Sequence, residues 1–166
     1  MSDKNELSHV SPSGQARMVD VSGKRATERS ATAEGWVRVG SQTAARLGDC
    51  GGLAKGNVLE TARLAGIMAA KRTSELIPMC HPLPLDAVDV TADLVDDRVR
   101  ITATATCTGR TGVEMEAMTA AAVAALTVYD MVKSASKAVE IGPVRLLEKR
   151  GGTSGHWKRE QTDGTR

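Results

Sequence analysis

The sequence predicts an α+β domain of the ferredoxin-like, split βαβ type, in which an antiparallel sheet carries both helices packed on one face. Three observations lead to this prediction. Segments with strand and helix periodicity follow one another in the order strand, helix, strand, strand, helix, strand. The two middle strands form a hairpin with one apolar face. The chain has 166 residues, enough for one domain with one core.

The first part of the pattern consists of a strand and two helices. A strand is expected at residues 30–39, where one face carries Ala31, Ala33, Val37 and Val39. A short helix is expected at residues 41–47. A long helix is expected at residues 57–76, because Asn57 provides an N-cap with Glu60 three residues later.

The hairpin is the clearest structural signal. The apolar residues are even-numbered over 88–94 and odd-numbered over 99–105. A two-residue turn at 96–97 pairs Leu94 with Val99, and this register places both apolar sets on one face. A second long helix, rich in alanine, is expected at 111–135. The last strand, 139–149, is broken at Gly142-Pro143, where the parity of its apolar residues switches as a bulge would require.

The composition excludes several classes of protein. A net charge of +2 lacks the basic excess of a dedicated nucleic-acid binder. With no Phe, one Tyr and two Trp, the chain lacks the several exposed rings that stack on bases. The core must therefore consist of small and aliphatic residues, and such a light core makes self-association a source of additional stability.

The three cysteines are far apart and form no C-x-x-C motif, so they fit neither a disulfide framework nor a zinc ribbon and suit a reducing cytoplasm. Residues 1–14 contain no apolar run of the signal-peptide kind, and the apolar stretch 117–128 is too short to span a membrane. Polar composition predicts flexible tails at residues 1–17 and 156–166, with a single domain at residues 18–155 between them.

A thiol and an imidazole stand side by side in the segment Ile77-Pro78-Met79-Cys80-His81-Pro82-Leu83. The prolines restrict φ and the preceding residue, so Cys80 and His81 are expected on a short, stiff, non-helical stretch. Three interpretations stay open. A zinc site would need further ligands, and a Cys nucleophile with a His base would need side chains that face each other. A buried Cys beside a loop His needs no chemistry.

Acidic residues cluster where a strand leads into the second long helix. Glycines before a helix N-terminus can present N–H groups to an anion. The spacing of Thr111 and Glu114 is also that of a capping box, and the pattern alone favours this structural interpretation of Glu114. The cap does not explain Met115 or Glu116.

Asp130 and Lys133 lie near the far end of that helix, three positions apart, where they can meet. A solvated ion pair is the commoner explanation. An aspartate at the C-terminal end of a helix opposes the dipole, however, and a placement against local preference favours a functional role. Other cations are scattered, and their spacing does not show which of them converge on a phosphate: Lys55, Lys71, Arg72, Lys137, Arg145, Lys149 and Arg150.

Seven segments together resemble the cyclic pyranopterin monophosphate synthase (MoaC) family of molybdenum cofactor biosynthesis, in one register from about residue 18 to residue 155. They are residues 18–22, 55–58, 69–73, 76–83, 108–117, 129–131 and 141–147. The resemblance implies the ferredoxin-like fold, one catalytic domain, and a cytoplasmic lyase that converts 3′,8-cyclo-7,8-dihydro-GTP into cyclic pyranopterin monophosphate and pyrophosphate. It also implies a homohexamer, a trimer of dimers, with active sites at the dimer interface.

The resemblance also assigns site residues. It implies substrate contacts from Met79, Cys80, His81, Glu114, Met115, Glu116 and Lys149. It implies catalytic roles for Asp130, Lys133 and Lys55, and it extends less distinctly to Lys24 and Arg29. No carboxylate cluster in the sequence demands a metal, so none is expected, although Mg²⁺ can accompany a triphosphate. A non-catalytic nucleotide- or pterin-binding module and a metal scaffold at Cys80-His81 are the alternatives.

Glu116 and Asp130 are 14 positions apart on one expected helix, hence roughly 21 Å along its axis. Either a long nucleotide spans both, or a neighbouring subunit completes the site. In the resulting hypothesis, lysines and His81 neutralise the triphosphate, and the acids at the start of the helix bind the N–H groups of the guanine-derived ring. Asp130 and Lys133 move protons, with the pKa of Lys133 lowered by desolvation and neighbouring cations.

Overall fold

The computed structural model describes residues 9–11, 13–50, 57–153 and 155–160. Its elements are β1 (Thr27–Arg38), α1 (Ser41–Cys50), α2 (Val58–Ala70), α3 (Thr73–Leu76), β2 (Ala87–Val95), β3 (Arg98–Gly109), α4 (Glu114–Val132), β4 (Glu140–Ile141), β5 (Arg145–Arg150) and β6 (Trp157–Lys158). The order of the main elements is the one predicted from periodicity.

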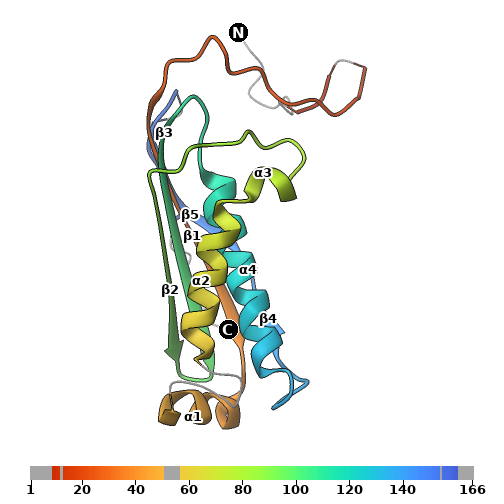
Figure 1. Ribbon diagram of the computed structural model, residues 1–166, viewed down its shortest axis with the longest axis vertical. Helices are drawn as coiled ribbons and strands as arrows, with labels where there is room; N and C mark the ends of the chain where they lie inside the picture. The colour runs from red at the N-terminus through yellow and green to blue at the C-terminus, as the bar shows by residue number, and fades with distance from the viewer. Residues whose placement is uncertain (1–8, 12, 51–56, 154, 161–166) are drawn as a thin grey trace.

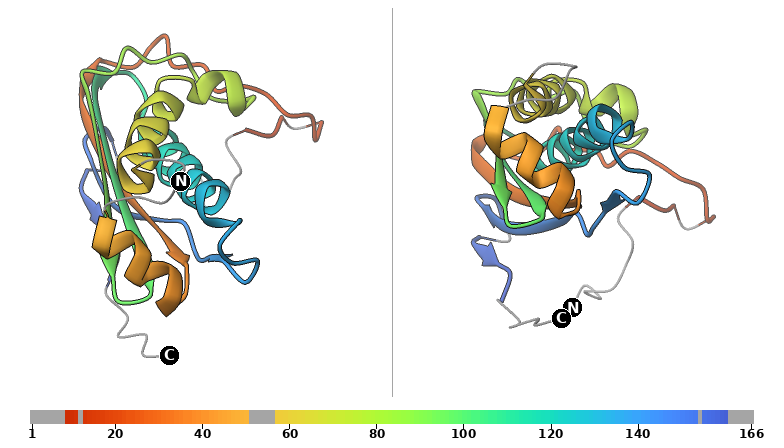
Figure 2. Two further views of the ribbon diagram at one scale, coloured as in Figure 1. Left: turned by 60° about the horizontal axis from the view of Figure 1, so that its bottom comes forward. Right: turned by 90° about the horizontal axis from the view of Figure 1, so that it is seen from below.

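The strands form one sheet in the order β2-β3-β1-β5-β6, and β4 also pairs with β1. Each neighbouring pair is antiparallel. Figure 1 shows α2 and α4 together on one face of this sheet, and Figure 2 shows α1 across one end of it. β3 lies between β1 and β2, and β1 lies between β3 and β5, so each strand–helix–strand unit is split by a third strand. The predicted ferredoxin-like, α+β fold is therefore confirmed.

The β2–β3 hairpin has the register that its hydrophobic pattern predicts. Leu94 pairs with Val99, and Val90 pairs with Ala103. Val90, Val99 and Ala103 are fully buried. Asp96 in the turn has a φ of +53°, a conformation that aspartate adopts more readily than most residues. The shared apolar face of the hairpin lies against the helices and forms one half of the core.

The predicted break in the last strand separates β4 from β5. Val37 pairs with Ile141, whereas Glu34 pairs with Arg145, so three steps along β1 match four steps along its partner. One extra residue in this stretch moves the side chains to the other face, which confirms the irregularity predicted at residues 142–143.

Beyond β5 the chain turns back and adds one more short strand. β6 pairs with β5 through Lys158 opposite Glu148 and Trp157 opposite Lys149. The segment from residue 156, expected as a tail, thus contributes a strand in its described part. This strand lies next to Lys149, one of the predicted site residues.

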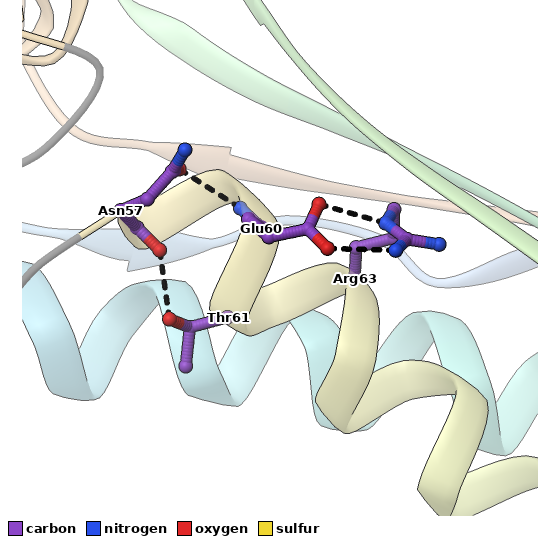
Figure 3. Close-up of polar contacts among 4 residues, drawn as sticks. All are labelled: Asn57, Glu60, Thr61 and Arg63. Carbon is purple, nitrogen blue, oxygen red and sulfur yellow. Dashed lines mark hydrogen bonds and ion pairs between the residues drawn. The ribbon is translucent and has the colours of Figure 1, made fainter.

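The first long helix starts as predicted, with Asn57 as its N-cap (Figure 3). The Asn57 Oδ1 accepts a hydrogen bond of 3.0 Å from the Glu60 N–H. The prediction of a single long helix over residues 57–76 is wrong, because α2 ends at Ala70 and α3 begins at Thr73. The Thr73 hydroxyl donates to the Ala70 carbonyl at 3.0 Å and so satisfies one carbonyl left without an intrahelical partner.

α4 is the central helix, and it spans Glu114–Val132 rather than the expected 111–135. It runs antiparallel to α2 (Figure 1) and approaches it closely at Gly66, where a Cβ would lie 3.0 Å from the Ala120 carbonyl oxygen and 3.3 Å from the Ala124 Cβ. Its length and composition would suffice to cross a membrane, yet 56% of that stretch is buried within the fold. It therefore packs as a core helix of this fold.

Candidate active site

The Cys80-His81 segment follows α3 and is non-helical, as predicted. Ile77 is extended, with φ −111° and ψ 108°, as expected of a residue before proline. The Cys80 N–H donates to the Ile77 carbonyl at 3.0 Å and closes a turn that has Pro78 at its second position. This stiff turn fixes Met79, Cys80 and His81 at the wall of a cavity.

This cavity, the Cys-His cavity, has a volume of about 380 Å³. Its wall comes from the segment after α3, the N-terminal end of α4 and the segment before β1. It brings together most of the predicted substrate-binding residues: Met79, Cys80, His81, Glu114, Met115 and Glu116. Residues that are far apart in the sequence thus meet at one end of the molecule.

A second cavity, the basic cavity, has a volume of about 590 Å³ and adjoins the first, because Lys24, Thr111, Gly112 and Glu114 line both. Its cationic lining residues are Lys24, Arg25, Arg29, Arg110, Lys149 and Arg150. Among the described lining residues, Glu114 is the one acid. Six cations against one carboxylate create a positive potential that suits a polyanion such as a triphosphate.

Glu114 joins the two cavities and does not cap α4. The N-cap is Val113, without a side-chain capping bond, so the capping-box interpretation is wrong. Instead, the Glu114 Oε1 accepts a 2.8 Å hydrogen bond from the Lys149 Nζ, and each side chain is 29% exposed. The carboxylate folds back over Gly112, where a Cβ would overlap it. A bond to a cation is stronger than a bond to a neutral N–H, which explains why the distant partner prevails over the local one.

Glu116 points into the protein and is only 4% exposed. Burial raises the pKa of Glu116, and the charge of Glu114 raises it further, against the effect of a backbone hydrogen bond. Burial also raises the pKa of Cys80, and the charge of Glu116 acts in the same direction. The Cys80 thiol is therefore protonated near neutral pH, which argues against the nucleophile interpretation. Between the lining residues Val19 and Val21, Asp20 accepts a 2.8 Å hydrogen bond from the Ser22 N–H, which lowers the pKa of Asp20, with a smaller contribution from His81.

Asp130 and Lys133 lie at the C-terminal end of α4, which Figure 1 shows at the opposite end of the helix from the α3 segment. The Asp130 Oδ1 and Lys133 Nζ are 2.6 Å apart, and both side chains are more than half exposed. The hydrogen bond and the charge of Asp130 raise the pKa of Lys133, so the hypothesis of a lowered pKa is wrong for the chain by itself. Lys55 lies outside the described residues.

One continuous helix joins the two groups of predicted residues. Fourteen positions separate Glu116 from Asp130, which places them roughly 21 Å apart along the axis of α4. The structure therefore brings together the substrate-binding residues of the prediction, including Lys149, but it does not bring Asp130 and Lys133 to them within one chain.

Sequence reasoning missed several cations of the basic cavity and assigned others to the site only weakly. Arg25 and Arg110 were not among the predicted site residues, and Lys24 and Arg29 were weaker candidates. A signal for Arg29 was available, because it continues the inward-facing row of odd-numbered residues in β1 beyond Ala31. No comparable pattern marks the other three, since they lie on loops.

The described part of the chain contains no group of three His, Cys, Asp or Glu side chains placed to hold a metal ion. Cys80 and Cys107 are free cysteines, and Cys107 is buried. The carboxylate of the basic cavity, Glu114, is bonded to Lys149.

Comparison with known proteins gives consistent results. The sequence profile of the MoaC family matches residues 18–152. A protein of Novosphingobium aromaticivorans is 56% identical over 154 residues, which are 93% of this chain and 98% of that protein. A protein of Chloroflexus aggregans is 53% identical over 160 residues, 95% of this chain and 96% of that protein. Both are named cyclic pyranopterin monophosphate synthase.

Proposed function

The chain belongs to the MoaC family, and we propose that it is a lyase of molybdenum cofactor biosynthesis that converts 3′,8-cyclo-7,8-dihydro-GTP into cyclic pyranopterin monophosphate with release of pyrophosphate. The observation that carries this proposal is the direct contact between the basic cavity and the Cys-His cavity. A nucleoside triphosphate has a polyanionic end and a polar heteroaromatic end, and the two cavities provide one environment for each.

The triphosphate binds in the basic cavity. Guanidinium groups form bidentate bonds to phosphate oxygens, whereas Lys149 contributes a single charge next to Glu114. Negative charge accumulates on the departing pyrophosphate as the bond to it breaks. Cations that are already in place therefore stabilise the transition state more than the bound substrate.

The guanine-derived ring binds in the Cys-His cavity. Glu114 and Glu116 accept hydrogen bonds from its amine and ring N–H groups, and Met79 and Met115 supply apolar contact. Because burial raises the pKa of Glu116, this residue is also able to hold a proton in the site. His81 lies on the same wall and contacts the substrate there.

Asp130 and Lys133 transfer protons in a site that a second copy of the chain completes. Both ends of the substrate are accommodated at the N-terminal end of α4, so no part of it is left to reach a pair roughly 21 Å away on the same helix. An ion pair at 2.6 Å is suited to passing a proton between donor and acceptor once it is enclosed. Lys55 joins this group in the proposal.

The assembly that we propose is a homohexamer, a trimer of dimers, with the active site at the dimer interface. Large apolar side chains exposed on the outer faces of α2 and α4 support self-association: Leu64, Met68 and Leu126, each about half exposed. The compartment that we propose is the cytoplasm, and Mg²⁺, where it takes part, enters bound to the triphosphate. Neither nucleic acid nor a membrane is part of the proposal.

Incubation of the purified oligomer with 3′,8-cyclo-7,8-dihydro-GTP, followed by mass spectrometry, is expected to show cyclic pyranopterin monophosphate and pyrophosphate in equal amounts. Asp130→Asn and Lys133→Ala are expected to keep the oligomer and to lower turnover about a hundredfold or more. Near-normal turnover in both folded variants would remove the pair from the mechanism. Binding of the substrate without its consumption would instead indicate a non-catalytic module.

A further inference from the structure

The chain leaves β5 through glycines in the left-handed region of φ. Gly151 has a φ of +94°, Gly152 of +74° and Gly155 of +65°. Residues with a side chain are strained at these angles, so backbone geometry alone favours glycine at each of the three positions. The surroundings of the three glycines differ, however, and the difference indicates separate roles.

A Cβ at each position would meet a different neighbour. At Gly155 it would meet nothing within 4 Å. At Gly151 it would overlap the carbonyl oxygen of Glu28, which belongs to the backbone of β1. At Gly152 it would overlap the Nη1 of Arg29 and lie 2.6 Å from its Cζ. Gly151 thus makes room for a strand, whereas Gly152 makes room for the end of a cationic side chain.

Arg29 is held at the rim of the core. It pairs with Cys107 across the β1–β3 ladder, and its Nε donates a 3.4 Å bond to the Gly109 carbonyl. Both Arg29 and Gly152 line the basic cavity. The guanidinium therefore lies between the end of β3 and the glycine turn, with the turn directly against its Nη1.

We propose that Gly152 is a positioning residue that keeps the Arg29 guanidinium directed into the basic cavity, and that it thereby sets the affinity for the triphosphate of the substrate. The proposal deepens the function proposed above, because it rests on the assignment of the basic cavity to a polyanion. A guanidinium forms strong bidentate bonds to phosphate only when its planar fork faces the oxygens. The orientation of Arg29 consequently matters as much as its charge.

An alanine at position 152 displaces the tip of Arg29. That tip is the far end of a flexible side chain, so it moves without disrupting the core, whereas a Cβ at 151 would have to displace the backbone of β1. The expected effect of Gly152→Ala is therefore weaker anion binding in a folded protein. Gly155→Ala introduces comparable backbone strain with no neighbour to displace, which makes it the matched control.

The test measures the binding of inorganic triphosphate to the full-length oligomer by titration calorimetry. Gly152→Ala and Arg29→Ala are each expected to weaken binding about tenfold, the effect of losing one charge-assisted contact. Gly155→Ala is expected to bind as the wild type does. In the Arg29→Ala background, Gly152→Ala should cause no further loss, because its effect acts through the missing side chain. With the nucleotide substrate, kcat/KM should fall about tenfold in Gly152→Ala and in Arg29→Ala, because the same cation contacts the bound triphosphate and the departing pyrophosphate.

Three results would overturn the proposal: wild-type affinity in Gly152→Ala, wild-type affinity in Arg29→Ala, or an undiminished effect of Gly152→Ala when Arg29 is absent. Arg29→Ala leaves the glycine turn intact, so it tests the proposal even where Gly152→Ala folds poorly. If the wild type and the variants bind triphosphate as expected, but the wild type forms no product from the cyclised nucleotide, the proposed reaction is refuted and the role of Gly152 stands.

Discussion

The proposed division of the site between two copies of the chain predicts a specific pattern of complementation. Asp130→Asn disables the C-terminal end of α4, and Glu116→Ala disables its N-terminal end. The two residues are 14 positions, roughly 21 Å, apart on one helix, so neither change disturbs the other end directly. Each variant alone should be inactive. When the two variants are co-expressed in equal amounts, half of the random dimers contain one copy of each. In such a dimer, one of the two sites combines the intact N-terminal end of α4 from one chain with the intact C-terminal end from the other. Activity should recover to roughly a quarter of the wild-type value.

A double variant provides the control. When Glu116→Ala/Asp130→Asn is co-expressed with the wild type in equal amounts, shared sites leave roughly a quarter of the activity, whereas sites contained in one chain leave roughly half. Differently tagged chains and tandem affinity purification establish that mixed oligomers form, and pyrophosphate release measures their turnover. Verified mixed oligomers with no recovered activity would refute the shared site.

Three further predictions concern single residues. Lys149→Met should lower kcat/KM about ten- to a hundredfold, since a charge-assisted contact to phosphate contributes about 1.5–3 kcal/mol, yet it should change Tm by only a few degrees, because its partly exposed pair with Glu114 contributes about 1 kcal/mol. A large loss of Tm with unchanged kcat/KM would show a structural role. The raised pKa of Glu116 means that the native state holds a proton more tightly than the unfolded chain. The contribution of Glu116 to the free energy of unfolding should therefore be greatest below the ordinary pKa of 4.5 and fall as pH rises through the raised value. Glu116→Gln should abolish that fall in urea denaturation between pH 4 and pH 8, and an unchanged slope would contradict the assignment. Cys80→Ser should retain turnover within about threefold, and alkylation of Cys80 should be slow at pH 7 and should still rise with pH beyond the usual thiol pKa of 9.0 instead of levelling off there. Rapid alkylation at pH 7 would indicate a reactive thiolate.

The fold was predictable where the spacing of apolar residues along the chain determines the structure. In the β2–β3 hairpin, burial of one face requires alternate residues to be apolar, and this requirement together with a two-residue turn determines the pairing of Leu94 with Val99. The junction of α2 and α3 was not predictable in the same way. Good helix-forming residues continue through it, and the Thr73 side chain closes α2 by a bond to Ala70 that no sequence period reveals.

The site was predictable only in part. The turn at Pro78 follows from the sequence because proline restricts the chain locally. The role of Glu114 did not follow from its spacing to Thr111, because the lysine that it binds is 35 positions away in the sequence. Spacing along a chain reports local partners, whereas the cations of the basic cavity come from several loops and strand ends. Their convergence is a property of the fold.

The two ends of α4 support the shared site by independent arguments. Asp130 lies in the last turn, where a negative charge is unfavourable against the dipole, and its solvent-exposed pair with Lys133 adds little stability. At the other end the dipole favours Glu114 and Glu116, yet Glu114 binds a lysine that is distant in the sequence, and both acids line a cavity. The helix alone explains neither the exposed pair at one end nor the partner of Glu114 at the other. Two copies related by a twofold axis with antiparallel α4 helices bring unlike ends together twice, and the dimer then contains two equivalent sites, each with binding cavities from one chain and a proton-transfer pair from the other.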